Sequence, residues 1–166
     1  MTGTARTLPL TGLTPEQQLH RLWAHEQEER QRYRRAAFHF LTLDLATSRL
    51  LALLGMECEA RLARIESLAG PRRLPPAAFG KIEHWPTATG IGDDPDAVAR
   101  RHFTQEIAAA KCAQQFYEAM CESNGMLALQ GILNEGFAQK RTEHLLLLEH
   151  LETLPLPAST PPTPTS

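Results

Sequence analysis

The feature that most constrains this chain is an acidic residue on the apolar face of a long predicted helix. Between residues 15 and 40, large apolar and aromatic side chains recur at intervals of three and four, the spacing of one helical face. Glu26 falls on that same face, in the middle of the stripe. Burying an unpaired carboxylate costs on the order of several kcal/mol. We therefore expect Glu26 to face a metal ion, a cation such as arginine, or a second acid that shares its proton.

Four long helices are predicted, and residues that start or stop helices bound each of them. The first helix follows Thr14, which has the spacing of a capping box with Gln17, and it extends to about Phe40. The other three are expected at about residues 45–68, 94–124 and 126–154. No segment has the alternating pattern of a β-strand. The sequence therefore predicts an all-α protein.

The segments between and around these helices predict how the helices are connected. Residues 70–94 are too rich in proline and glycine for a continuous helix, and they are long enough to form a crossover. The other two links are short, so we expect two antiparallel hairpins in one four-helix bundle over residues 14–154. Residues 1–13 are expected to form a flexible arm. Residues 155–166, rich in proline, serine and threonine, are expected to be disordered.

Composition argues against several classes of function. The net charge is −2 over 166 residues, and acidic and basic residues are closely mixed, whereas a nucleic-acid surface needs a basic face. The chain has no run of about 18 apolar residues, and its first residues lack the apolar core of a secretory signal. We therefore expect a cytoplasmic protein that binds neither nucleic acid nor a membrane.

An ionisable residue also falls near mid-height on the predicted inward face of each remaining helix. These residues are Glu57 on the second helix, Glu106 on the third, and Arg141 and His144 on the fourth. Acids from three helices and an imidazole from the fourth would form an oxygen-rich metal site suited to iron or manganese. Arg141 offers an alternative, because its guanidinium could neutralise Glu26 and Glu57 without a metal.

In these motifs the chain resembles the ferritin-like superfamily, most nearly the diiron domain of rubrerythrin-type proteins, over about residues 15–153. Glu26 and Tyr33 match the ligand glutamate of the family's first helix and the aromatic residue seven positions later. Glu57 matches the start of the Glu-x-x-His motif on the second helix, and His144 matches the end of that motif on the fourth. The resemblance implies a ferritin-like bundle, in which carboxylates hold two irons that reduce peroxide or oxidise ferrous iron.

The chain departs from the family at three of the six expected ligands. Ala60 stands where the second helix carries histidine, and Arg141 stands where the fourth carries glutamate. Ala110 occupies the glutamate position six residues before the Phe116–Tyr117 pair of the third helix. Loss of these ligands should abolish at least one iron position.

Two functions remain open at this stage. The first is a metal-free ferritin-like protein that serves as an assembly or regulatory module, with Arg141 in place of the metal charge. The second is an iron- or manganese-dependent redox or metal-handling protein that keeps a partial site. The ligands of that partial site would be Glu26, Glu57, Glu106 and His144. Tyr33 and Tyr117 are expected beside either site.

The expected partners follow from the resemblance and from the tail. Bundles of this family commonly pair along their helices, so the resemblance implies a homo-oligomer, in the first instance a homodimer. The proline-rich tail, residues 155–166, is the expected contact for any further protein partner.

Overall fold

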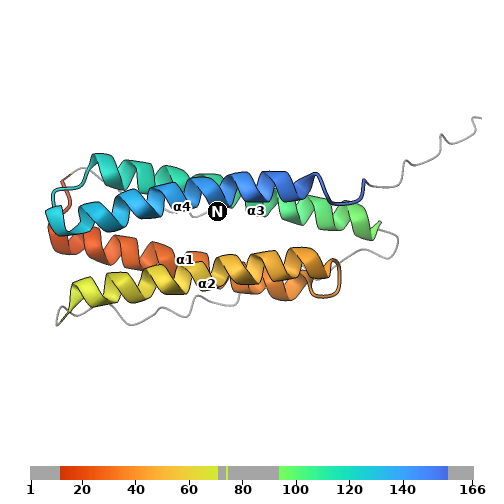
Figure 1. The fold of residues 1–166 in the computed structure, drawn as a ribbon, viewed down its shortest axis with the longest axis horizontal. Helices are drawn as coiled ribbons and strands as arrows, with labels where there is room; N and C mark the ends of the chain where they lie inside the picture. The colour runs from red at the N-terminus through yellow and green to blue at the C-terminus, as the bar shows by residue number, and fades with distance from the viewer. Residues whose placement is uncertain (1–11, 71–73, 75–93, 157–166) are drawn as a thin grey trace, which may run out of the picture.

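The computed structural model of the chain describes residues 12–70, 74 and 94–156, and these residues form four long helices (Figure 1). The helices are α1 (Pro15–Phe40), α2 (Leu45–Ala69), α3 (Pro95–Glu122) and α4 (Leu127–Leu151). No β-strand occurs in the described part of the chain. The prediction of an all-α protein with four helices is confirmed.

Side-chain caps fix where three of the helices begin. Thr14 Oγ1 accepts a hydrogen bond from the backbone of Gln17 at 3.2 Å, and the backbone of Thr14 donates to Gln17 Oε1 at 2.8 Å. The predicted capping box is therefore present at the start of α1. Asp44 accepts from the backbone of Thr47 at 2.8 Å at the start of α2, and Asp94 caps α3. These caps satisfy backbone donors that the helices leave unpaired.

The helices form two antiparallel hairpins, one of α1 and α2 and the other of α3 and α4 (Figure 1). Because α2 and α3 run in the same direction, the end of α2 and the start of α3 lie at opposite ends of the bundle (Figure 1). The predicted crossover, residues 70–94, lies outside the described residues except for Gly70, Leu74 and Asp94. The predicted terminal arm and tail also lie largely outside them, since residues 1–11 and 157–166 are not described.

The core consists of two apolar clusters separated by a layer of buried charges. One cluster surrounds Phe40 and Phe103, near the end of α1, and the other surrounds Leu22 and Leu133, near its start. Burying a leucine or phenylalanine side chain contributes about 1.5–3 kcal/mol, so these clusters supply most of the driving force for folding. The charged layer lies between them, at the height of Glu26 on α1.

The residues predicted to face inward on α1 and α3 lie in the core. On α2 and α4 the buried face differs from the predicted one by a rotation about the helix axis. On α2 the buried face contains Leu51, Leu54, Cys58 and Arg61, so Glu57, predicted to face inward, is one residue off that face. On α4 it contains Leu133, Gly136, Lys140, Glu143 and Leu147, so Arg141 and His144 are one residue off the inward face. A shift of one residue turns a helix by about 100°, and this changes which charges are buried.

Gly136 fixes the register of α4 against α3. A Cβ atom at this position would overlap the ring of Tyr117, which is fully buried and packs directly on the α4 backbone. Lys140 and Glu143 follow four and seven residues later on the same helical face, so the packing of Tyr117 directs them into the interior. The identity of the buried charges on α4 therefore depends on one glycine.

Replacing Gly136 by alanine should destabilise the protein by about 1–3 kcal/mol, because the added methyl group overpacks the core. Gly55→Ala is the matched control, since a Cβ there would meet Tyr33 Cβ at an ordinary 3.6 Å. That control should be neutral or stabilising, because alanine favours a helix over glycine by about 1 kcal/mol. Urea denaturation measures both values. Equal stability of Gly136→Ala and wild type would contradict the proposed packing.

Candidate functional site

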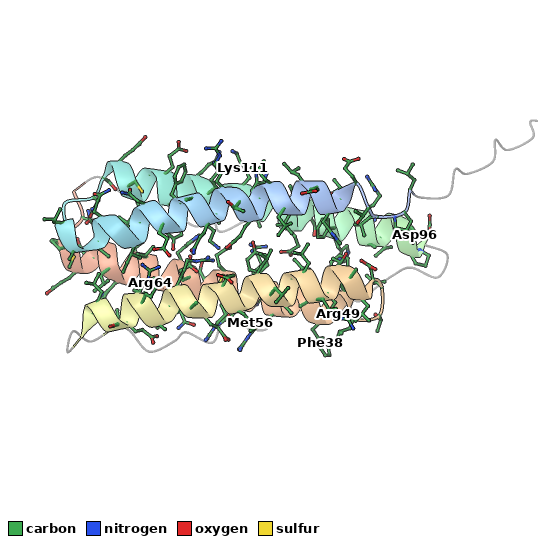
Figure 2. The ribbon with its side chains drawn as sticks, in the orientation of Figure 1. Phe38, Arg49, Met56, Arg64, Asp96 and Lys111 are labelled. Carbon is green, nitrogen blue, oxygen red and sulfur yellow. The ribbon has the colours of Figure 1, made fainter. Side chains whose placement is uncertain are left out.

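Charged side chains from all four helices meet at the middle of the bundle. We call them the charge cluster, which consists of Glu26, Glu29, Arg32, Arg61, Glu106, Lys140 and Glu143. All but Arg32 are at most 6% exposed. Side chains from both hairpins fill the space between them, as Figure 2 shows. This is the largest departure of the core from an ordinary apolar interior, and it is the candidate functional site.

Lys140 lies at the centre of the charge cluster and is fully buried. Its Nζ atom lies 3.2 Å from Glu29 Oε2, 3.0 Å from Glu143 Oε2 and 3.9 Å from Glu26 Oε1. Burial lowers the pKa of Lys140, but the carboxylates of Glu26, Glu143 and Glu29 outweigh burial and raise the pKa above its ordinary value. Lys140 is therefore a charged ammonium that joins α4 to α1.

Arg61 is the second buried cation, and it joins α2 to α1 and α4. Its Nε atom donates to Glu26 Oε2 at 3.0 Å, and its Nη2 atom lies 2.9 Å from Glu143 Oε1. Nη1 donates to Gln139 Oε1 at 3.2 Å. Burial lowers the pKa of Arg61, but Glu26 and Glu143 more than offset this, so its pKa is raised.

Glu26 is fully buried and has cationic companions. Besides Arg61 and Lys140, it contacts the hydroxyl of Tyr117, which donates to Glu26 Oε1 at 2.7 Å. Burial raises the pKa of Glu26, but Lys140 and Arg61 outweigh burial and hold it below its usual range. Of the three companions considered for Glu26, the described residues provide the cation.

Arg32 extends the charge cluster to its edge, where it contacts acids on two helices. Its Nη2 atom donates to Glu29 Oε2 at 2.8 Å, and its Nη1 atom donates to Glu106 on α3. Burial raises the pKa of Glu29, but Arg32 and Lys140 outweigh it and lower the pKa to about 2. Burial raises the pKa of Glu106, and Arg32 offsets only part of that effect. Four carboxylates of the charge cluster face three cations, and Arg32 is the one cation with which Glu106 forms an ion pair among the described residues.

Two tyrosines and one cysteine complete the surroundings of the charge cluster. Tyr33 donates to Glu143 Oε2 at 3.1 Å, and Tyr117 donates to Glu26. Burial raises the pKa of both hydroxyls, so both act as hydrogen-bond donors. Burial likewise raises the pKa of the Cys58 thiol, to about 12, which leaves it protonated beside Arg61.

The structure does not bring the four predicted metal ligands together. Glu26 and Glu106 belong to the charge cluster, whereas Glu57 is exposed and His144 is half-buried outside the cluster. In the described part of the chain, no group of three histidine, cysteine, aspartate or glutamate side chains could hold a metal ion. Arg141 is exposed, so the prediction that it is the buried charge partner is wrong.

The charge cluster does not fit an iron or manganese ion. The inward pairs at i and i+3 are Cys58 with Arg61 on α2 and Lys140 with Glu143 on α4. The resemblance predicts Glu-x-x-His one residue away from each of these pairs, at Glu57 to Ala60 and at Arg141 to His144. A divalent cation at mid-height would be repelled by Lys140 and Arg61, and the carboxylates it needs already pair with those cations.

The sequence contained one signal for the buried residues that the predicted stripes miss. Glycine in the middle of a helix often marks close approach of another element. Gly136 indicates that its own face of α4, which includes Lys140 and Glu143, is buried. Gly55 indicates in the same way that Cys58 on α2 is buried. For Arg61 no comparable local signal exists.

Comparisons with models of protein families, with curated proteins and with solved structures give no match to this chain. Among the described helices, none has both the length and the apolar character that crossing a membrane requires.

Replacing Lys140 by methionine should destabilise the protein by about 3–5 kcal/mol, because it leaves buried carboxylates without a counter-charge. Lys111→Met is the matched control, since Lys111 is exposed on α3 (Figure 2) and should change stability by about 0.5 kcal/mol at most. Urea denaturation at neutral pH compares the two variants. Similar losses in both would show that Lys140 does not hold the charge cluster together.

His25 should make the protein less stable in mild acid. Its ring stacks on Phe116 at 3.9 Å between centroids, and its buried Nε2 atom has no hydrogen-bond partner in the described residues. Burial lowers the pKa of His25 from 6.5 to about 4, so on acidification the unfolded chain takes up the proton first. Stability should therefore fall by about 2 kcal/mol between about pH 7.5 and about pH 5.

The variant His25→Phe tests this, because it keeps an aromatic ring but removes the titrating group. Denaturation midpoints measured across that pH range should fall less steeply for the variant than for wild type. Parallel pH profiles for the two proteins would contradict the assignment.

Proposed function

We propose that this chain is a divergent ferritin-like bundle whose centre is closed by ion pairs in place of metal ions, and that it serves as a metal-free assembly or regulatory module. The observation that supports this most directly is Lys140, whose buried ammonium contacts Glu29 and Glu143 at 3.2 and 3.0 Å. Carboxylates at the centre of such a bundle would otherwise be ligands for metal.

The helix directions support the ferritin-like part of the proposal. Since α2 and α3 run in the same direction, α2 ends and α3 begins at opposite ends of the bundle, as a long crossover requires (Figure 1). A helix as long as α2, 25 residues, spans about 38 Å, and an extended chain covers up to about 3.3 Å per residue. The connecting segment is long enough for this crossover.

The chemistry of the charge cluster supports the metal-free part. One ammonium and two guanidinium groups neutralise carboxylates, as metal ions would, but they neither change oxidation state nor bind peroxide. Both tyrosines that flank the cluster donate to its carboxylates and keep raised pKa values. In this proposal the charge cluster has a structural role, as a metal site would have, but it has no redox role.

An apolar surface on the outer face of α1 and α2 supports a role in assembly. Phe38 is 76% exposed and Met56 is 63% exposed, and both point away from the α3–α4 hairpin in Figure 2. They flank a groove of about 390 Å³ that also contains the ion pair between Arg34 and Glu59. Two copies related by a two-fold axis could pair their apolar residues and exchange these charges. We assign the expected homodimer to this face.

Changing Phe38 and Met56 together to glutamate should abolish the dimer without unfolding the bundle, because both side chains are exposed. Sedimentation equilibrium measures the mass, and circular dichroism checks the fold. A wild-type monomer, or a dimer that survives the double substitution, would contradict this assignment.

Metal content tests the proposed function itself. Protein purified after growth with added iron and manganese should contain less than about 0.1 metal ion per chain, because Lys140 and Arg61 repel a divalent cation. EDTA should leave the melting temperature unchanged. Stoichiometric iron or manganese, or a lower melting temperature with EDTA, would support the alternative of a partial metal site.

A variant that restores the ligand pattern is the matched control for this measurement. It carries Cys58→Glu, Arg61→His, Ala110→Glu, Lys140→Glu and Glu143→His, which place Glu-x-x-His on the observed inward faces of α2 and α4. If the bundle is ferritin-like, the folded variant should bind ferrous iron. A folded variant that binds none would contradict the ferritin-like geometry.

A further inference from the structure

A cavity between α2 and α4 reaches from the surface down to the charge cluster. Its volume is about 340 Å³, which is within the range of small-molecule sites. The apolar part of its lining is Leu54, Ala138 and Leu146, and the charged part includes Glu57, Arg61 and Glu143. The cavity thus combines an apolar wall with carboxylates at two depths.

The deeper carboxylate, Glu143, has an oxygen that makes no hydrogen bond. Glu143 is 5% exposed, and its Oε2 atom accepts from Lys140 and Tyr33. Its Oε1 atom is buried and forms an ion pair with Nη2 of Arg61 at 2.9 Å, but this pair lacks the geometry of a hydrogen bond, so Oε1 accepts none from the described residues. A buried carboxylate oxygen without a hydrogen bond is costly, and a donor entering the cavity would satisfy it.

The carboxylate at the rim, Glu57, is also available. It is exposed, and it has no hydrogen-bond or ion-pair partner among the described residues. Among the described residues, Arg61 is the one cation that lines the cavity, and it is ion-paired with Glu26 and Glu143 and also donates to Gln139 and Cys58. Three carboxylates, those of Glu57, Glu135 and Glu143, thus line the cavity together with one guanidinium, so negative charge exceeds positive charge in the lining.

From this arrangement we propose that the α2–α4 cavity binds a small organic ammonium ion, namely a primary amine with a short apolar chain. The ammonium donates to Glu57 and to Oε1 of Glu143, and the chain packs against Leu54 and Leu146. Anions are disfavoured, because they would meet three carboxylates, those of Glu57, Glu135 and Glu143. This site goes beyond the proposed assembly role and does not depend on the dimer or on the absence of metal.

Titration of the ¹⁵N-labelled full-length protein with n-butylammonium chloride tests the proposal. Ionic strength is held constant, and ammonium chloride and sodium butyrate are titrated in parallel to separate the contributions of charge and chain. We expect saturable amide shifts over residues 54–61 and 135–146 with n-butylammonium, weaker binding of ammonium, and no saturation with butyrate. Absence of saturable shifts with n-butylammonium, or equal binding of butyrate, would overturn the proposal.

Two variants assign the binding to this cavity. Glu57→Gln should raise the dissociation constant of n-butylammonium at least about threefold, because it removes one exposed ionic contact. Ala138→Phe should abolish binding by filling the cavity, and Ala138 is exposed enough to accept the larger ring. Glu59→Gln is the control, since Glu59 is on the same helix but lines the opposite groove. Unchanged affinity in Glu57→Gln, with the fold intact, would overturn the proposal.

Discussion

The structure depends on the contacts that Lys140 makes in the middle of the bundle. A buried ammonium is tolerated because carboxylates from two helices surround it, and each of those acids has a second partner in Arg61 or Arg32. Such a network is stable only when complete, because removing one member leaves an uncompensated charge in a medium of low dielectric constant. The hairpin of α1 and α2 and the hairpin of α3 and α4 must therefore pack in one register.

The two apolar clusters and the charge cluster have different roles. The apolar clusters bury leucines and aromatic rings at both ends of the bundle, and they provide free energy without requiring one particular register. The charge cluster requires that register, since Arg61 must reach Glu26 and Lys140 must reach Glu29. The packing of Tyr117 on Gly136 supports the same alignment, because it places Lys140 on the inward face. In this protein, buried charge contributes to specificity and the apolar clusters to stability.

The helices could be predicted from the sequence because their signals are local. Thr14, Gln17 and Asp94 determine helix starts through contacts within a few residues, and the structure has the helices close to their expected bounds. The need of Glu26 for a counter-charge was also predictable, because it follows from the cost of burying an acid anywhere on an apolar face.

The identity of that counter-charge could not be predicted, because it depends on rotation about two helix axes. Neighbouring leucines on α2 and α4 fit either of two faces, so hydrophobic periodicity alone does not choose between Glu57 and Cys58 or between Arg141 and Lys140. The choice is made by contacts between helices, above all the overlap that any side chain at Gly136 would have with Tyr117. These contacts join residues far apart in the chain, and a resemblance in local motifs does not contain them.

We propose that ion pairs between the two hairpins, rather than metal ions, fill the centre of the bundle and determine how the hairpins pack. A double-mutant cycle on Lys140 and Glu29, which lie on opposite hairpins 3.2 Å apart, measures this most directly. Urea denaturation of wild type, Lys140→Met, Glu29→Gln and the double variant gives the coupling free energy between the two side chains. We expect a coupling free energy of at least about 1.5 kcal/mol between Lys140 and Glu29. Additive effects of the two substitutions, within about 0.5 kcal/mol, would contradict it.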